Sequence, residues 1–281
     1  SDGAETTSSE YGNELYSEIS EDEASSTQES NGAVIKWTIY DSGTLLIENA
    51  EGGNGKTPNR APWFEFKDRI TTVVMSDDIT GIGDRAFMGY DKITNLAFGS
   101  NLARIGVSAF EGCTGLGAVR FNGETAKLFI GERAFRGCKN LTIVLSTGSI
   151  GGFGNYAFEN CSKLQSVGAA TGSIGISEGS FLNCTSLTDV VTYDNSGVVL
   201  LGSLSKYAFS GCSALKGIII GERTRTIPEA AFDGCSSLES ILFGSNVTTI
   251  GKSAFHNCTG LESIEIPGTV ETVGEQAFAG C

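Results

Sequence analysis

Eight cysteines carry the richest chemistry in this chain, and their spacing limits what that chemistry is. Each lies three residues after a phenylalanine, and most neighbours along the chain are 23 residues apart, so the short-spaced ligand pairs of a zinc site are missing. An even count would permit disulfides. If each cysteine marks one coil of a stacked array, however, equivalent thiols lie about 4.8 Å apart with parallel side chains, a poor arrangement for pairing. We therefore predict free, buried thiols that act as small apolar side chains. The positions are Cys113, Cys138, Cys161, Cys184, Cys212, Cys235, Cys258 and Cys281.

The other reactive residues do not assemble a catalytic pattern. His256 is the only histidine, and it holds a repeat position that several other repeats fill with a charged or hydroxyl side chain, so we expect it to face solvent rather than serve a triad. Gly251-Lys252-Ser253 resembles the end of a phosphate loop, but Asn246 stands where the first glycine belongs. The adjacent Asp77-Asp78 lacks the opposed geometry of an acid/base couple. We predict a protein that is not an enzyme, with no catalytic residues, no cofactor and no metal.

The elements that position these residues follow from a longer pattern, Ala-Phe-x-Gly-Cys-x-x-Leu. It recurs every 23 residues in most repeats, with two extra residues before Phe135 and five before Phe209. Periods of this length mark a solenoid, in which each coil buries its core against its neighbours. Apolar residues nine and eleven positions after the phenylalanine have strand periodicity. We predict about nine 23-residue repeats with a parallel β-sheet face and short helical turns opposite. The phenylalanines are Phe87, Phe110, Phe135, Phe158, Phe181, Phe209, Phe232, Phe255 and Phe278.

One turn position is restricted in every repeat. The residue two after the phenylalanine is always glycine or asparagine, as at Gly89 and Asn160. These residues best tolerate a positive φ, so we predict that each helical turn ends in the left-handed conformation.

A candidate binding face comes from the residues ten positions after each phenylalanine. They lie between two inward-pointing strand positions, so their side chains are expected to point outward. Several are apolar, and contiguous exposed apolar side chains often mark interaction surfaces. The alternative is that aliphatic residues occur there because they favour strands. The face consists of Arg120, Leu145, Val191, Ile219, Leu242 and Glu265.

The chain divides into three predicted parts. Residues 1–33 are acidic and rich in Ser and Thr, and we expect a disordered spacer. Residues 34–69 are expected to form an N-terminal cap, with Trp37 and Trp63 in its core and a β-hairpin turning at Asp41-Ser42-Gly43. The solenoid occupies residues 70–281.

Composition excludes several classes of function. The net charge is −14, and the first 30 residues contain nine acidic side chains with no Lys or Arg, which opposes contact with nucleic-acid phosphates. No apolar stretch approaches the roughly 18 residues of a membrane span. The first residues also lack the basic and apolar regions of a signal peptide.

The full repeat unit, Ile-Gly-x-x-Ala-Phe-x-Gly-Cys-x-x-Leu-x-x-Ile-x-Ile/Phe, resembles the BspA-like leucine-rich repeat, found mainly in surface proteins of anaerobic bacteria. Residues 250–266 show it almost unbroken, and Trp37–Trp63 resembles the end module that often precedes such repeats. The resemblance covers about residues 34–281. It implies export and a right-handed leucine-rich-repeat coil, and it brings no catalytic residues. The last repeat stops at Cys281, before its leucine and strand, so we expect the natural protein to continue.

These observations together predict a non-catalytic bacterial protein, secreted or at the cell surface. The resemblance implies adhesion, or binding of an extracellular protein or glycan, through the solenoid surface. We expect a monomer. Two alternatives remain, a structural spacer and a targeting module of a longer surface protein or enzyme.

Overall fold

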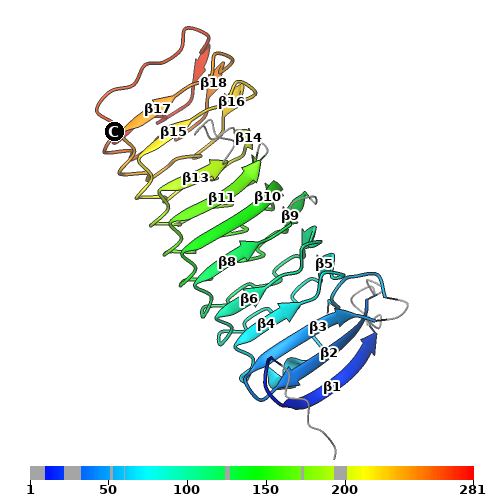
Figure 1. Cartoon of the computed structure of the whole chain (residues 1–281). Helices are drawn as coiled ribbons and strands as arrows, with labels where there is room; N and C mark the ends of the chain where they lie inside the picture. The colour runs from blue at the N-terminus through cyan, green and yellow to red at the C-terminus, as the bar shows by residue number, and fades with distance from the viewer. Residues whose placement is uncertain are drawn as a thin grey trace, which may run out of the picture.

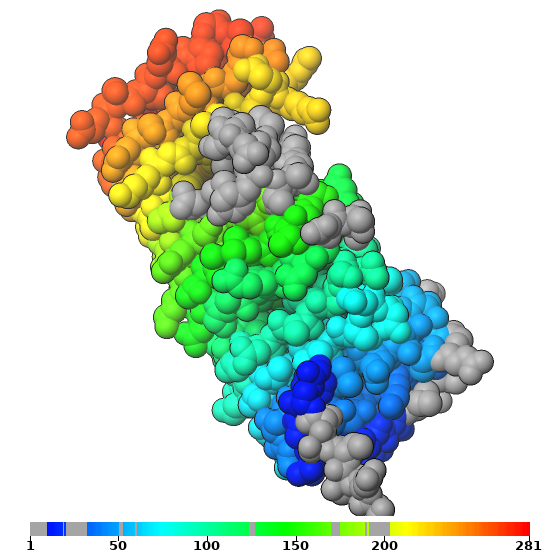
Figure 2. Space-filling view, viewed as in Figure 1, coloured from blue at the N-terminus to red at the C-terminus, as the bar shows by residue number. Residues whose placement is uncertain are grey.

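Successive coils of the chain stack along one axis in the computed structural model, which describes residues 10–21, 33–50, 53–59, 61–123, 127–171, 174–192 and 201–281. The coils follow one another from the blue N-terminal end to the red C-terminal end (Figures 1 and 2). Parallel strands pair one repeat apart, as in Val144 with Val167 and Val167 with Val190. The predicted β-solenoid is thus confirmed.

One line of parallel strands arises at the predicted strand positions. Its inward side chains are aliphatic and buried, as at Val119, Val144 and Val167, because strand residues alternate between core and solvent. The members are β4 (Thr72–Met75), β6 (Asn95–Ala97), β8 (Ala118–Phe121), the first half of β10 (Ile143–Phe153), β11 (Ser166–Thr171), β13 (Asp189–Thr192), β15 (Gly217–Ile219) and β17 (Ser240–Leu242).

A second line of parallel strands lies five residues before the phenylalanines, and the sequence did not predict it. Most of these strands have two or three residues, which is too short for an alternating pattern to show. The pairing of Ile227 with Ile250 and of Ile250 with Val273 nevertheless keeps the one-repeat register. The members are β5 (Gly81–Ile82), β7 (Arg104–Ile105), β9 (Leu128–Ile130), the second half of β10, β12 (Ile174–Ile176), β14 (Leu201–Leu204), β16 (Thr226–Ile227), β18 (Thr249–Ile250) and β19 (Thr272–Val273).

The predicted helical turns are wrong, because the segment around each phenylalanine is a non-helical turn. The N–H groups of Arg85, Phe87 and Gly89 donate to carbonyls of the next coil at 2.7–2.9 Å, so these groups do not continue a helix. Within the described residues the only helix is the 3₁₀ helix η1 (Phe64–Phe66). The left-handed residue two after the phenylalanine is confirmed, as at Gly89 with φ 74°.

A second left-handed residue, which the sequence did not predict, lies two before each phenylalanine. The residue type at this position varies between repeats, and it is glycine in only one of them. The two left-handed positions bracket the phenylalanine and turn alternate N–H groups toward the neighbouring coil. The residues are Arg85, Ser108, Arg133, Tyr156, Gly179, Tyr207, Ala230, Ser253 and Gln276.

Stacked phenylalanine rings form the spine of the core. The rings from Phe87 to Phe278 stack with centroids 5.2–5.5 Å apart and planes tilted by 1–13°. Trp63 extends the stack at its N-terminal end, 5.3 Å from Phe87. Each ring fills the space that its neighbours leave, so a coil is stable only in the array.

The cysteines lie beside this spine and are free, as predicted, with seven buried and Cys281 exposed. Each thiol donates a hydrogen bond of 3.0–3.2 Å to the phenylalanine carbonyl of the preceding coil, as Cys161 does to Phe135. The N–H of Cys138 donates to the same carbonyl of Phe135 at 3.1 Å. The thiols therefore tie adjacent coils together as well as filling space.

An N-terminal cap closes the first coil. β2 (Val34–Tyr40) and β3 (Thr44–Asn49) pair as the predicted hairpin, with Gly43 at φ 83° in the turn. β3 pairs in parallel with β4, which joins the cap to the first line of strands. Trp37 and Trp63 are buried, with ring centroids 6.2 Å apart.

The acidic N-terminal segment differs in part from its predicted disorder. β1 (Glu14–Glu21) pairs antiparallel with β2. Tyr16 packs against Trp37 with ring centroids 5.0 Å apart, and the indole N–H of Trp37 donates to Ser20 at 2.9 Å. β1 forms despite the acidic composition of this segment, because β2 offers a free edge for backbone pairing and Trp37 offers an aromatic contact. The rest of the predicted spacer, residues 1–9 and 22–32, lies outside the described residues.

Candidate functional site

The central part of the candidate binding face is brought together on adjacent strands. Leu145 on β10 lies opposite Arg120 on β8 and opposite Gly168 on β11. Val191 on β13 lies opposite Gly168, although its side chain is outside the described part. Arg120 is exposed and Leu145 is half-buried, so this part of the face is polar with one partly covered apolar side chain.

The C-terminal part of the face is more open. Ile219 on β15 pairs with Leu242 on β17, and Leu242 is 63% exposed. Gly217 and Ser240, two residues earlier on the same strands, are small and exposed, and Ile219 itself is half-buried. Glu265 is exposed as predicted but lies in no strand. The part of the face that is formed by β-strands therefore ends at β17.

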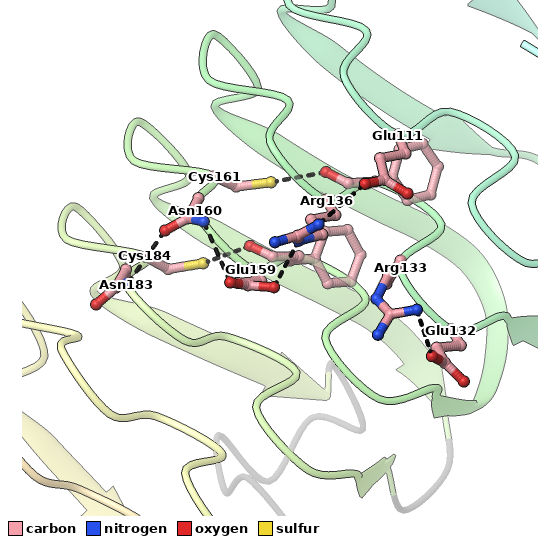
Figure 3. Close-up of polar contacts among 11 residues, drawn as sticks. Glu111, Glu132, Arg133, Arg136, Glu159, Asn160, Cys161, Asn183 and Cys184 are labelled. Carbon is pink, nitrogen blue, oxygen red and sulfur yellow. Dashed lines mark hydrogen bonds and ion pairs between the residues drawn. The ribbon is translucent and has the colours of Figure 1, made fainter. Parts of the chain in front are cut away.

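The turn side of the coils carries a polar cluster that the sequence did not indicate as a site. Arg136, one residue after Phe135, lies between carboxylates of the two neighbouring coils (Figure 3). Its Nε contacts Glu159 at 2.6 Å and its Nη1 contacts Glu111 at 3.2 Å. The hydrogen bond and charge of Glu159 are the main reasons that the pKa of Arg136 is raised. The alternation of Glu111, Arg136 and Glu159 at one repeat position could have signalled these bridges.

Two asparagines extend this cluster toward the C-terminus. The amide Nδ2 of Asn183 donates to Oδ1 of Asn160 at 3.1 Å, and Nδ2 of Asn160 donates to Glu159 at 3.3 Å. Both asparagines hold the left-handed position, with φ near 60°. Their side chains follow one another across neighbouring coils in Figure 3. The result is one hydrogen-bonded row from Asn183 to Glu111.

The row borders two shallow hollows. One, the amide groove, has a volume of about 580 Å³ and is lined by Glu111, Gly112, Arg136, Gly137, Lys139, Asn160, Ser162, Asn183 and Thr185. The other, the ionic groove, measures about 470 Å³ and is lined by Arg85, Met88, Ser108, Glu111, Arg133, Arg136, Tyr156 and Glu159. Glu111 and Arg136 line both hollows, so the guanidinium is reachable from either side.

The remaining reactive groups have structural partners. His256 is part-buried and its Nδ1 lies 2.8 Å from a carboxylate oxygen of Asp233, the equivalent residue of the preceding coil. Burial raises the pKa of Cys113 to about 12 and raises the pKa of Cys161 well above its usual range. A thiol held protonated in this way is a poor nucleophile and a poor metal ligand.

The described residues contain no cluster of metal-ligand type and no helix of membrane-spanning type. No three His, Cys, Asp or Glu side chains converge as metal ligands would within these ranges. In the same part of the chain, no helix has the length and apolar content needed to cross a bilayer.

Several solved structures of bacterial leucine-rich repeat proteins are similar to this chain. No curated protein sequence matches it significantly. A leucine-rich repeat protein from Eubacterium ventriosum is 19% identical, with 94% of this chain and 95% of that chain covered and a TM-score of 0.35. One from Bacteroides ovatus is 19% identical over 94% and 91%, with a TM-score of 0.36. A leucine-rich cell surface protein from Faecalibacterium prausnitzii is 19% identical over 92% and 88%, with a TM-score of 0.38.

The family match covers most of the chain. Six copies of the BspA type leucine-rich repeat region are matched across residues 61–188 and 153–281. The matched span holds the phenylalanine stack, the cysteines and both lines of parallel strands. The chain therefore belongs to the BspA-type leucine-rich repeat family.

Proposed function

We propose that this chain is a non-catalytic binding module of an exported bacterial protein, and that its strand face holds an extracellular protein or glycan. The observation that carries the proposal is the pairing of exposed Leu242 with half-buried Ile219 on the neighbouring strand. A leucine that is 63% exposed on a sheet gains little from its position unless something covers it. Arg120, exposed on the same line of strands, adds a charged contact for the rim of an interface.

The fold supports this role by rigidity rather than by a deep pocket. The inter-coil hydrogen bonds and the ring stack hold outward side chains at fixed spacing along the array. A partner then contacts many coils at once, and few side chains need to reorder on binding. A small number of central apolar contacts is expected to dominate the affinity.

The test is a substitution at the most exposed apolar position of the face. Leu242→Ser removes the side chain with little loss of buried area, and Leu242→Ser with Ile219→Ser removes the pair. Met88→Ser, at an exposed apolar residue on the turn side, is the matched control. Binding to a panel of purified extracellular-matrix proteins and immobilised glycans is measured by biolayer interferometry, with circular dichroism as the check on folding.

The expected result is binding by the wild type to at least one probe and about tenfold weaker binding by folded Leu242→Ser. Met88→Ser should bind as the wild type does. If the folded double variant binds with unchanged affinity, the strand face is not the binding surface. Absence of binding to every probe would instead favour the structural spacer.

A further inference from the structure

We propose that the amide groove on the turn side is a second binding site, separate from the strand face, and that it takes a neutral polysaccharide of β-linked sugars. The position two residues after each phenylalanine, which is left-handed, differs in residue type between the groove and most other coils. Glycine fits this position with less backbone strain, and six of the nine repeats have it. Asparagine occurs in the two adjacent repeats that line the groove, at Asn160 and Asn183, and once elsewhere at Asn257.

These two amides have hydrogen-bonding capacity left over. A carboxamide offers two N–H donors and two acceptor lone pairs. Asn183 donates once, to Asn160, and Asn160 donates once, to Glu159. Because Asn183 is exposed and Asn160 is half-buried, the remaining donor and acceptor positions are available to a ligand in the groove. Planar side chains of this kind bind adjacent hydroxyl groups with one donor and one acceptor at a time.

The charge of the groove favours a neutral ligand. Arg136 is held by two carboxylates, at 2.6 Å from Glu159 and 3.2 Å from Glu111. Arg136 and Lys139 are the cations of the groove. Glu111 and the adjacent Glu159 are its anions, so the charges balance. A polyanion would gain no net attraction and would approach the Glu111 carboxylate. A hydroxyl-rich ligand instead meets donors and acceptors that are already oriented by the row.

The spacing of the coils selects among hydroxyl-rich ligands. The rings behind the groove have centroids 5.3–5.5 Å apart from Phe110 to Phe181, and direct backbone hydrogen bonds between the turns hold adjacent coils about 5 Å apart. One sugar ring of an extended β-linked chain advances by nearly the same length, so two neighbouring sugars would lie beside Asn160 and Asn183 on adjacent coils. A peptide strand advances about 3.3 Å per residue and falls out of register. A helix has a similar pitch, but its polar backbone groups are satisfied internally.

The test uses substitutions that preserve the backbone and the charge. Asn160→Gly with Asn183→Gly installs the residue that most other repeats carry there and removes only the two amides. Asn257→Gly makes the same change outside the groove and is the matched control. Native gels containing hydroxyethyl cellulose, a mixed-linkage β-glucan or dextran sulfate measure retardation, and the variants can be compared directly because their net charge is equal.

We expect retardation of the wild type by a neutral glucan, a loss of about tenfold in affinity for the double variant, and no change for Asn257→Gly. Leu242→Ser should be retarded like the wild type, which separates this site from the strand face. The proposal is overturned if neither neutral glucan retards the wild type, or if only dextran sulfate does. It is also overturned if the double variant and Asn257→Gly lose affinity equally, since the change would then be one of backbone and not of the groove.

Discussion

Removal of one ring from the middle of the phenylalanine stack should split the solenoid into two independent parts. Phe158 is fully buried, with Phe135 and Phe181 stacked on its two faces at 5.5 Å and Phe153 edge-on at 5.3 Å. Phe158→Ala loses the apolar burial of the ring and leaves a cavity that rigid neighbouring coils cannot close. Such substitutions cost about 3–5 kcal/mol, and because Phe158 has three aromatic neighbours we expect a loss of about 4–5 kcal/mol.

The chain offers two probes for the measurement. Both tryptophans, Trp37 and Trp63, lie in the N-terminal cap, so urea unfolding followed by tryptophan fluorescence reports on that end. Far-ultraviolet circular dichroism reports on all coils. In a solenoid, stability is the sum of coil and interface contributions, so a weak central interface uncouples the ends. We expect coincident transitions for the wild type and separated ones for Phe158→Ala.

Phe129→Ala is the matched control, because Phe129 is 51% exposed on β9 and stands outside the stack. It should cost about 1 kcal/mol or less and leave the two probes coincident. The reasoning is refuted if Phe158→Ala changes the free energy of unfolding by no more than the control does. Coincident transitions at a strongly reduced stability would show that the array is more cooperative than nearest-neighbour coupling allows.

Three further predictions follow from the turns, the carboxylates and the thiols. Gly112→Ala should destabilise the protein by about 1 kcal/mol in urea unfolding, because Gly112 has φ 74°, whereas Gly117→Ala, which meets open space, should have a smaller effect. Ser245 donates to Glu222 and lowers its pKa, so the stabilisation by this carboxylate is present at neutral pH and is lost as the pH falls through the lowered pKa. The stability advantage of the wild type over Glu222→Gln should therefore shrink in acid, and a constant difference from neutral to acidic pH would contradict this. In native protein a thiol reagent should modify the seven buried cysteines only after unfolding, and rapid reaction of several of them would exclude the buried array.

Residue types at fixed spacings in the sequence were enough to predict much of the fold. The 23-residue period predicted the coil, the phenylalanine and cysteine slots predicted the buried spine, and the Gly/Asn slot predicted the left-handed residue at Gly89 and its equivalents. Of the candidate face, Arg120, Leu145, Ile219 and Leu242 lie on strands where they were expected, whereas Glu265 does not. Whether this face binds a partner stays a prediction.

The features that were missed depend on the neighbouring coil. Arg85, Tyr156 and their equivalents adopt a left-handed conformation that their residue types do not favour, because N–H groups of the turn bond to carbonyls of the next coil. The same bonds replace the predicted helical turns. The charged bridge of Arg136 also exists only when Glu111 and Glu159 are stacked on either side of it.

The sequence by itself determined the coil, its buried spine and one turn of each repeat, because those properties depend on residue type at fixed spacing. Tertiary structure alone decided the second line of strands, the pairing of the acidic β1 with β2, and the polar row that borders the amide groove. Each of these requires groups from different segments of the chain to meet in register. Such contacts are set by the stacking of whole coils, which no single segment encodes.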